Sequence, residues 1–253
     1  MNKKSNLYNF LLLIVSTFLW LMIWEISALI INKTFIFPGA ILTLKTLFDF
    51  ILMIDFWKTV SISILRIFSG LILGIIAAVA SAVLCRLVPI TKSFVTIGMT
   101  VIKSTPVAAV IMIMWLFINS ELLPVFISML MVCPVNWQNL MDGFSAIDKD
   151  LDEVTVIFNF SKNKRLKYLV LPTLLKFFIP AVLTSIGLAW KSGIASEIIS
   201  YAKLSIGKYI YDAKWTFEGA ELLAWTLTVV LISLFFELTV KMLVRRLTAK
   251  YGY

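Results

Sequence analysis

The sequence predicts an all-α fold: a polytopic membrane bundle of about six transmembrane helices, forming a single domain over residues 1–253. Of the 253 residues, 60% are hydrophobic, whereas a soluble domain contains about 45–50% apolar residues. The mean hydropathy is +0.97. Charged residues make up only 15% of the chain and gather between long apolar runs. This is the pattern of a chain that crosses a bilayer several times.

Six apolar runs are long enough to cross about 30 Å of hydrocarbon, because a helix rises about 1.5 Å per residue. In chain order, the predicted spans are Leu7–Ile31, Val60–Cys85, Phe94–Ile118, Leu122–Met141, Leu169–Ile199 and Leu222–Val244. The first run could also be a secretory signal peptide. It is longer than the apolar core of such a peptide and has no small-x-small cleavage site, so we expect a retained helix.

Two segments between the spans are expected to lie at the membrane surface or outside it. Charged side chains interrupt the apolar pattern of residues 37–56, which is typical of a helix lying along the interface. Residues 200–219 are expected to form an extracytoplasmic loop. This loop contains Tyr209, Tyr211 and Trp215, aromatic residues of the kind that gather at the membrane–water boundary.

Small residues and a proline predict helix contacts and a break within the spans. Pro106 removes a backbone donor and clashes with the preceding turn, so the third span should kink or break there. Small residues at four-residue spacing let another helix backbone approach closely. They form two stripes: Gly70, Gly74, Ala78 and Ala82 in the second span, and Ala181, Ser185, Ala189 and Gly193 in the fifth.

The charge distribution predicts the orientation. The chain has 23 Lys and Arg residues against 14 Asp and Glu residues, a net charge of +9. If both termini are cytoplasmic, the inner segments carry more than twice as many basic residues as the outer segments, counting Lys3, Lys4, Arg245, Arg246 and Lys250 at the termini. This bias favours a multi-pass cell-membrane protein with both termini in the cytoplasm. No basic stripe interleaves with exposed aromatic residues, so nucleic acid is not an expected partner, whereas the lipid bilayer is.

Several common catalytic elements are absent from the sequence. There is no histidine, the usual general base and metal ligand. Cys85 and Cys133 are far apart and form no CxxC motif, so we expect free thiols. No GxxxxGK[ST] phosphate loop occurs, so another chain would have to supply any ATP site. We therefore expect no catalytic residues, metal site or cofactor in this chain.

The longest polar interruption runs from Asp148 to Pro172, and two short cytoplasmic helices are expected within residues 145–168. Ser145 or Asp148 can cap the first helix, whose acidic first turn suits the positive end of the helix dipole. Pro172 should mark a bend into the fifth span.

The end of the first short helix is predicted at Asn159, because asparagine tolerates the left-handed conformation that follows a helix. Ser161 can then cap the second helix. Val154, Ile157 and Phe158 give the first helix an apolar face.

This segment resembles the cytoplasmic loop of ABC importer permeases. The family pattern is EAA, three residues, G, nine residues, and I-x-L-P. The chain reads Glu153-Val154-Thr155, then Asn159, then Leu169-Val170-Leu171-Pro172, with every spacing kept. Both alanines, the glycine and the isoleucine of the pattern are replaced.

Other segments resemble further motifs of the same family. They are Phe37-Pro38-Gly39, Ser63 to Gly70 (S-L-x-R-x-x-x-G), Lys103 to Ala108 (basic-x-x-P-x-A), Gly187 to Glu197 (G-x-A-W…A-x-E) and Ser205-Ile206-Gly207 (G-x-G, with Ser first). The resemblance extends from about Phe37 to Arg246. It is closest to the branch that contains nitrate, sulfonate, taurine and pyrimidine-precursor importers.

The resemblance implies a mechanism and a set of partners. Two permease subunits, here expected to be identical, would form the pathway. Two cytoplasmic ABC ATPase subunits, which hold ATP and magnesium, would dock on the short helices and rock the spans between inward-open and outward-open states. An extracytoplasmic binding protein would deliver the solute. The expected ATPase-docking residues are Asp150, Asp152, Glu153, Val154, Ile157, Phe158 and Asn159.

Candidate pathway residues follow from charge, backbone irregularity and motif: Arg66, Lys103, Pro106, Trp190, Lys191 and Glu197. Arg66 and Lys103 have a second interpretation, as structural ions that pair with Glu25, Glu197 or carbonyl groups. For Lys191 and Glu197 the alternative to lining the pathway is a structural role. Basic residues outnumber acidic ones within the spans, which leans towards a small anionic solute.

Two other function classes compete with the ATP-driven permease. One is a subunit of an ion-gradient-driven secondary transporter, with Glu25, Glu197 or Glu237 as the coupling acid. The other is a membrane enzyme, for which the sequence offers no convergent nucleophile–base or metal-ligand cluster.

Overall fold

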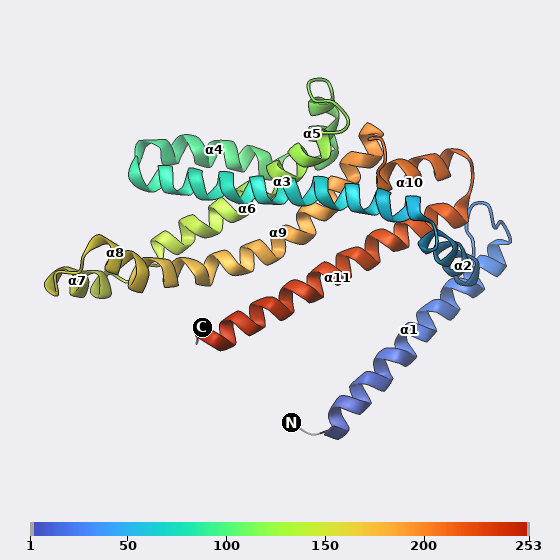
Figure 1. The fold of residues 1–253 in the computed structure, drawn as a ribbon, viewed down its shortest axis with the longest axis horizontal. Coiled ribbons are helices and arrows are strands. Elements are labelled where there is room, and N and C mark those ends of the chain that lie inside the picture. The colour runs from blue at the N-terminus through green and yellow to red at the C-terminus, as the bar shows by residue number, and fades with distance from the viewer. Residues whose placement is uncertain (1–2, 252–253) are drawn as a thin grey trace.

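The computed structural model describes the backbone of residues 3–251 and the side chains of residues 8, 11, 12 and 14–242. Every element in this part of the chain is helical, so the predicted all-α class is confirmed (Figure 1). The basic side chains counted at the two termini lie outside the described residues. The elements are α1 Lys3–Ile31, α2 Ala40–Ile51, α3 Ile54–Leu87, α4 Ile90–Ser104, α5 Val107–Trp115, α6 Leu123–Ser145, α7 Lys149–Ile157, α8 Lys162–Arg165, a π-helical turn Leu166–Val170, α9 Leu171–Ser200, α10 Ile206–Trp215 and α11 Gly219–Tyr251.

Within the described part of the chain, five stretches of helix are long and apolar enough to cross a membrane, and the pair α4–α5 makes a sixth if the two helices form one span. The two helices meet at 102°. Thr105, which precedes Pro106, has an extended backbone with φ −82° and ψ 132°, because proline disfavours the helical conformation of the residue before it. The predicted break at Pro106 is confirmed.

Helix α6 lies at the centre of the bundle, packed between α3 and α9 (Figure 1). The first small stripe faces α6 so closely that a Cβ atom on Gly70 would lie 2.3 Å from the Val125 carbonyl oxygen. A Cβ atom on Gly74 would lie 2.8 Å from the carbonyl oxygen of Met129. The predicted packing seam on α3 is therefore confirmed.

The second small stripe, on α9, faces both other central helices. Asn136 of α6 donates a 2.6 Å hydrogen bond to the hydroxyl of Ser185. Ser128 donates to the Ala189 carbonyl at 3.2 Å. A Cβ atom on Gly193 would meet Ile67 of α3 at 2.5 Å. Small residues and interhelical hydrogen bonds thus hold the three helices together in the absence of water.

Two predicted boundaries are corrected by the structure. The helix expected over residues 37–56 covers only Ala40–Ile51, and the second span starts at Ile54 rather than Val60. Asp55 suits the positive end of α3 and pairs with Lys58 one turn later at 3.0 Å, so these polar residues extend the span helix.

The predicted bend at Pro172 is wrong. Helix α8, the π-helical turn and α9 follow one another without an intervening loop and form one 39-residue helical span, Lys162–Ser200. Pro172 lies in the first turn of α9. The wider turn just before it realigns the hydrogen-bond ladder, so the missing proline N–H is accommodated without a break. The second short helix is therefore the start of the fifth span.

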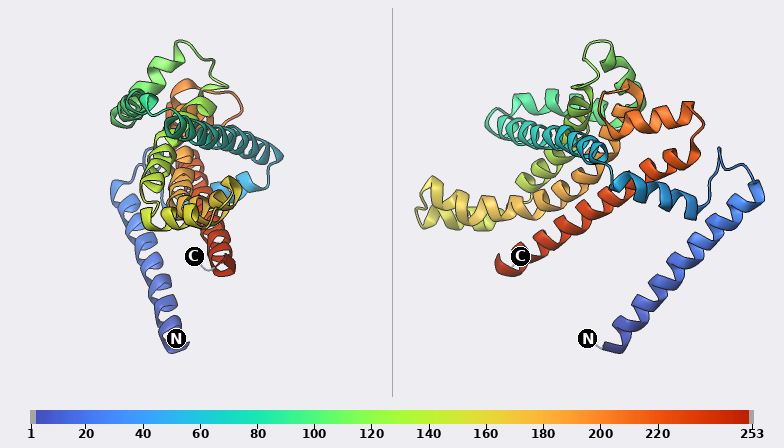
Figure 2. Two further views of the ribbon diagram at one scale, coloured as in Figure 1. Left: turned by 90° about the vertical axis from the view of Figure 1, so that its left-hand side faces the viewer. Right: turned by 45° about the vertical axis from the view of Figure 1, so that its right-hand side comes forward.

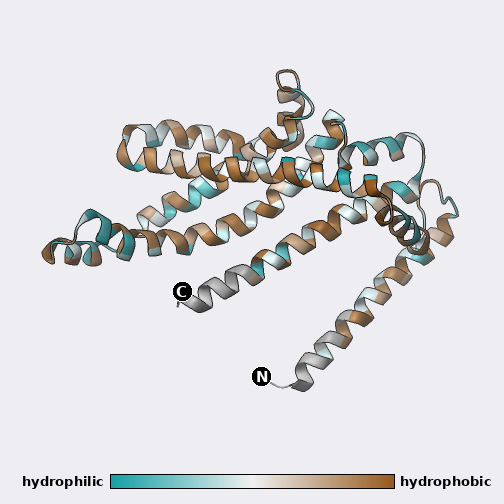
Figure 3. Ribbon diagram, in the orientation of Figure 1, coloured by the Kyte–Doolittle hydropathy of each residue, from teal (hydrophilic) through white to brown (hydrophobic). Residues whose placement is uncertain are grey.

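The two ends of the bundle differ in character. Helices α7 and α8 project at one extremity, whereas α2, α5 and α10 gather towards the opposite end (Figures 1 and 2). Hydrophilic residues concentrate in α7–α8 and around α10, and the helices between them are mainly hydrophobic (Figure 3). Helix α1 stands apart from the bundle and meets it near its C-terminal end, where Trp24 donates to the Pro38 carbonyl at 3.0 Å. The segment 200–219 contains α10, a helix that the sequence did not predict.

We predict that Gly70→Ala destabilises the bundle by about 1–3 kcal/mol, because the added methyl overlaps the α6 backbone. Thermal unfolding of the purified chain in detergent measures this effect. Gly98→Ala is the matched control, since a Cβ atom there meets nothing within 4 Å and alanine favours a helix over glycine. Equal midpoints for the two variants would contradict the close α3–α6 contact.

Candidate functional site

Helix α7 begins and ends as its sequence predicts. The Asp148 carboxylate accepts hydrogen bonds from the amides of Asp150 at 2.8 Å and Leu151 at 3.3 Å, so Asp148 and not Ser145 is the N-cap. Asn159 adopts the left-handed conformation with φ 50°. The amides of Asn159 and Phe160 donate to carbonyl oxygens of the last helical turn at 3.0 and 2.9 Å. This is a Schellman ending, in which Asn159 takes the position usual for glycine.

An ion pair holds α7 against α8. The Arg165 guanidinium donates two hydrogen bonds of 2.6 Å to the two carboxylate oxygens of Asp152. This fork geometry fixes the direction of the carboxylate as well as its distance. Ser161 caps α8 as predicted, by accepting from the Lys164 amide at 3.4 Å. Asp152, one of the predicted docking residues, is therefore used inside the segment to orient α7.

The other predicted docking residues form an exposed surface on α7. The side chains of Val154, Ile157 and Phe158 are 42, 73 and 70% exposed. Asp150 and Glu153 are also exposed. Thr155, on the opposite face, is buried and bonds to the Asp152 carbonyl. An apolar surface with an acidic border, held rigidly at the extremity of the molecule, is suited to contact with another protein.

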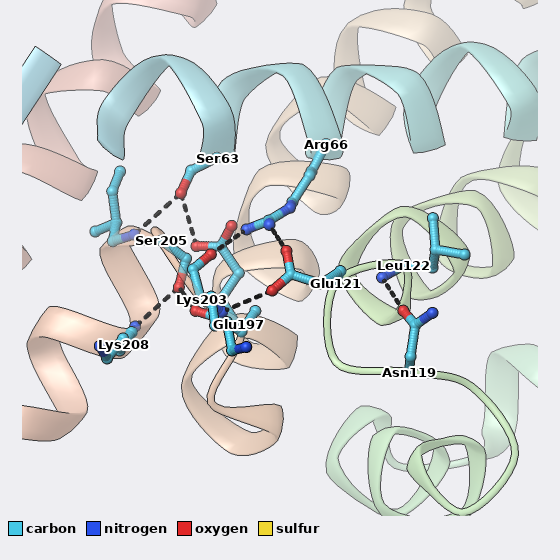
Figure 4. A network of polar contacts seen from close by, with 11 residues as sticks. Ser63, Arg66, Asn119, Glu121, Leu122, Glu197, Lys203, Ser205 and Lys208 are labelled. Atoms are coloured by element: carbon cyan, nitrogen blue, oxygen red, sulfur yellow. Dashed lines mark hydrogen bonds and ion pairs between the residues drawn. The ribbon is translucent and has the colours of Figure 1, made fainter. Parts of the chain in front are cut away.

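At the opposite end of α9, the buried side chain of Glu197 caps helix α10. Its Oε2 atom accepts a hydrogen bond from the Ser63 hydroxyl at 2.9 Å and from the Gly207 amide at 3.2 Å (Figure 4). The Ser63 oxygen in turn accepts from the Ile206 amide at 3.0 Å. Amides in the first turn of a helix have no partner within the helix, and here α3 and α9 supply the partners.

The capping site is closed to larger side chains. A Cβ atom on Gly207 would lie 2.4 Å from the Cβ atom of Glu197 and 2.5 Å from the Ile198 amide nitrogen. Ser205 adds a further cap by accepting from the Lys208 amide at 3.0 Å. The Ser205-Ile206-Gly207 motif therefore serves to bring the start of α10 against α9.

Arg66, one turn along α3 from Ser63, joins two loops. Its guanidinium forms an ion pair with Glu121, in the loop between α5 and α6, and donates to the Lys203 carbonyl at 2.9 Å (Figure 4). The second oxygen of Glu121 accepts from the Lys203 amide at 3.2 Å. Arg66 thus has a carboxylate and a carbonyl as partners, as the structural interpretation expected, but the acid is neither Glu25 nor Glu197.

The structure brings together only part of the predicted pathway set. Arg66 and Glu197 lie in one network, whereas the side chains of Lys103, Pro106 and Lys191 are exposed. Trp190 is 1% exposed, and its indole N–H donates to the Val229 carbonyl of α11 at 3.0 Å. A groove of about 260 Å³ between α9 and α11 runs past Trp190 and Glu237. Within the described residues, no group of three potential metal ligands occurs.

Sequence reasoning missed Glu121 as the partner of Arg66. Glu121 belongs to the short polar run Asn119-Ser120-Glu121 between two apolar spans. That run indicated a loop, but nothing in its spacing identified Arg66 as the contact. The pairing forms because helix α3, the α5–α6 loop and the α9–α10 loop meet at one end of the bundle. This meeting is a property of the tertiary structure.

The sequence model of a family described as "binding-protein-dependent transport system inner membrane component" matches residues 70–249. The chain belongs to this family. The match includes α7, the Glu197 site and α10, and it starts after the proline turn at residues 37–39 and after Ser63.

Two curated relatives resemble part of the permease. Both are bicarbonate transport system permease proteins named CmpB, one from Synechococcus elongatus and one from Synechococcus sp.. Each is 35% identical over 75 residues, which cover 30% of this chain and 27% of the relative. The permease therefore matches about a quarter of the length of these relatives.

We predict that Glu197→Leu lowers the free energy of unfolding by about 3 kcal/mol, because the Ser63 hydroxyl and the Gly207 amide lose a buried acceptor. Hydrogen exchange at residues 206–208 should accelerate in parallel. Glu237→Leu is the matched control: this acid is exposed, and among the described residues its ion-pair partner is Lys241, one turn away on α11. The unfolding midpoint of that variant should stay close to that of the parent chain. Equal losses in both variants would contradict the capping role.

Proposed function

We propose that this permease is the transmembrane subunit of an ATP-driven ABC importer and forms the translocation pathway as a dimer. The observation that carries the proposal is the exposed apolar surface of α7, presented at one extremity of a bundle that matches an importer permease family. Two cytoplasmic ATPase subunits, which bind ATP and magnesium, dock on this surface. A binding protein on the opposite side delivers the solute.

The continuous helical span 162–200 supports the proposed coupling between the two ends. It begins beside α7, to which the Arg165–Asp152 pair connects it, and it ends at Glu197 beside α10. A displacement of the docked segment is therefore carried along α9 to the outer loops. Closely packed helices respond to such a push as rigid bodies.

The proposed solute is a small molecule of the nitrate, sulfonate, taurine, bicarbonate or pyrimidine-precursor type, and among these an anion is favoured. Lys103 and Lys191 have exposed side chains, and Pro106 bends the third span directly after Lys103. The proposed pathway set also includes Arg66, Trp190 and Glu197, which hold the outer part of the translocation pathway in position. The relatives named for bicarbonate transport favour an anion.

The structure weighs against the secondary-transporter alternative, because each proposed coupling acid already has a structural partner. Glu25 accepts a hydrogen bond from the Ile41 amide at 3.1 Å, Glu197 caps α10, and Glu237 pairs with Lys241 at 2.5 Å. An acid that binds and releases a coupling ion would have to leave such a partner in each cycle.

Docking should fail when the apolar surface of α7 is made polar. We expect Phe158→Asp to weaken co-purification of the ATPase subunits by about 30-fold or more, as for a central interface residue. Glu153→Arg should abolish both ATPase binding and transport while the chain remains in the membrane. Phe117→Asp, which alters a side chain 78% exposed at the other end of the bundle, should retain the ATPase. If the Phe158→Asp variant also retained the ATPase subunits, the proposed docking role of α7 would be wrong.

The proposed topology predicts opposite accessibility for two exposed lysines. In a background with Cys85 and Cys133 replaced by alanine, Lys164→Cys should react with a membrane-impermeant maleimide only from the cytoplasmic side. Lys214→Cys should react only from outside, because α10 lies at the opposite end of α9. Labelling of both positions from the same side would exclude this orientation with cytoplasmic termini.

A further inference from the structure

A basic pocket of about 230 Å³ lies between the α3–α4 turn, the end of α6 and the start of the helical span 162–200. It is formed by residues from three separate parts of the chain. The lining residues are Arg86, Phe144, Ile147, Lys162, Arg165, Leu166 and Val170. Arg165 also orients α7 through its pair with Asp152, and the other lining residues have no role in the proposed docking or transport.

The charged residues that line this pocket, Arg86, Lys162 and Arg165, are all basic. Arg165 is engaged by Asp152, but within the described part of the chain neither Arg86 nor Lys162 forms an ion pair with a carboxylate. The Arg86 guanidinium lies 6.0 Å from the centre of the Phe144 ring, which holds it over the pocket wall. Two unneutralised cations facing one cavity favour an anionic ligand.

The remaining walls are apolar and sit where the membrane spans end. Phe144 and Ile147 close one side, and Leu166 and Val170 close the other. Leu87 and Tyr168, next to the basic residues, are 74 and 64% exposed. A ligand suited to this site combines a negative group with hydrocarbon, at the level where the span helices give way to the polar segment.

We propose that this pocket binds the phosphate headgroup of an anionic phospholipid. The phosphate lies between Arg86 and Lys162, and the acyl chains follow the exposed apolar faces of α3 and α9. Basic pockets between transmembrane helices bind lipid headgroups in this way. Since Arg165 lines the pocket and also holds Asp152 of α7, the lipid sits at the joint between the docking helix and α9. The proposal does not depend on the transported solute or on the ATPase.

The test is native mass spectrometry of the full chain in detergent, titrated with phosphatidylglycerol and, separately, with phosphatidylcholine. We expect Arg86→Gln and Lys162→Gln each to weaken phosphatidylglycerol binding about fivefold, and the double variant about 25-fold, at roughly 1 kcal/mol per basic contact. Arg86→Lys should retain most of the binding, because it keeps the charge. Phosphatidylcholine binding should be weak and insensitive to all these changes.

Lys92→Gln is the matched control, since it removes one exposed positive charge near the same turn but outside the pocket. Equal losses in Lys92→Gln and Arg86→Gln, or unchanged binding in the double variant, would overturn the proposal. A third titration uses inorganic phosphate. If millimolar phosphate displaces phosphatidylglycerol, or binds as tightly without it, the pocket is a free-phosphate site and the lipid assignment is wrong. Unfolding midpoints of the variants verify that each remains folded.

Discussion

The close packing of α6 against α3 and α9 is the contact on which the rest of this structure depends. In hydrocarbon there is no hydrophobic force to bring helices together, so association relies on near approach of backbones and on hydrogen bonds between helices. Gly70 and Gly74 provide the approach on α3, and the Asn136–Ser185 bond links α6 to α9. Most of the remaining elements are arranged around these three helices, whereas α1 stands off from them (Figure 2).

Two carboxylates within apolar segments, Glu25 and Glu197, share one structural use in this protein. Glu25, in α1, accepts from the Ile41 amide at the start of α2, and Glu197, in α9, accepts from the Gly207 amide at the start of α10. Helix starts present unpaired amides that cannot be left in an apolar environment. A distant glutamate satisfies them and also ties the short helix to a long one. This explains the presence of two intramembrane acids without invoking ion transport.

The π-helical turn between α8 and α9 connects the two functional ends of the molecule. Without it, Pro172 would interrupt the helix where the polar segment joins the span. With it, Arg165, which pairs with Asp152 of α7, and Glu197, which caps α10, lie at the two ends of one continuous helical element. The proposed docking helix and the proposed lipid pocket both adjoin this element, so the two proposed interactions would act on the same rigid part of the permease.

The sequence by itself determined the features that depend on local chemistry. Hydropathy identified the spans, the residue before Pro106 had to leave the helix, and Asn159 had to end α7, because backbone sterics and capping act over a few residues. Small-residue spacing also identified the two packing seams, since a four-residue repeat places them on one helix face. The sequence could not pair Arg66 with Glu121 or Glu197 with Gly207, and it misplaced a bend at Pro172. Those outcomes were decided by the tertiary structure. The two pairings depend on which loops meet at one end of the bundle, and the continuous path through Pro172 depends on the π-helical turn that precedes it.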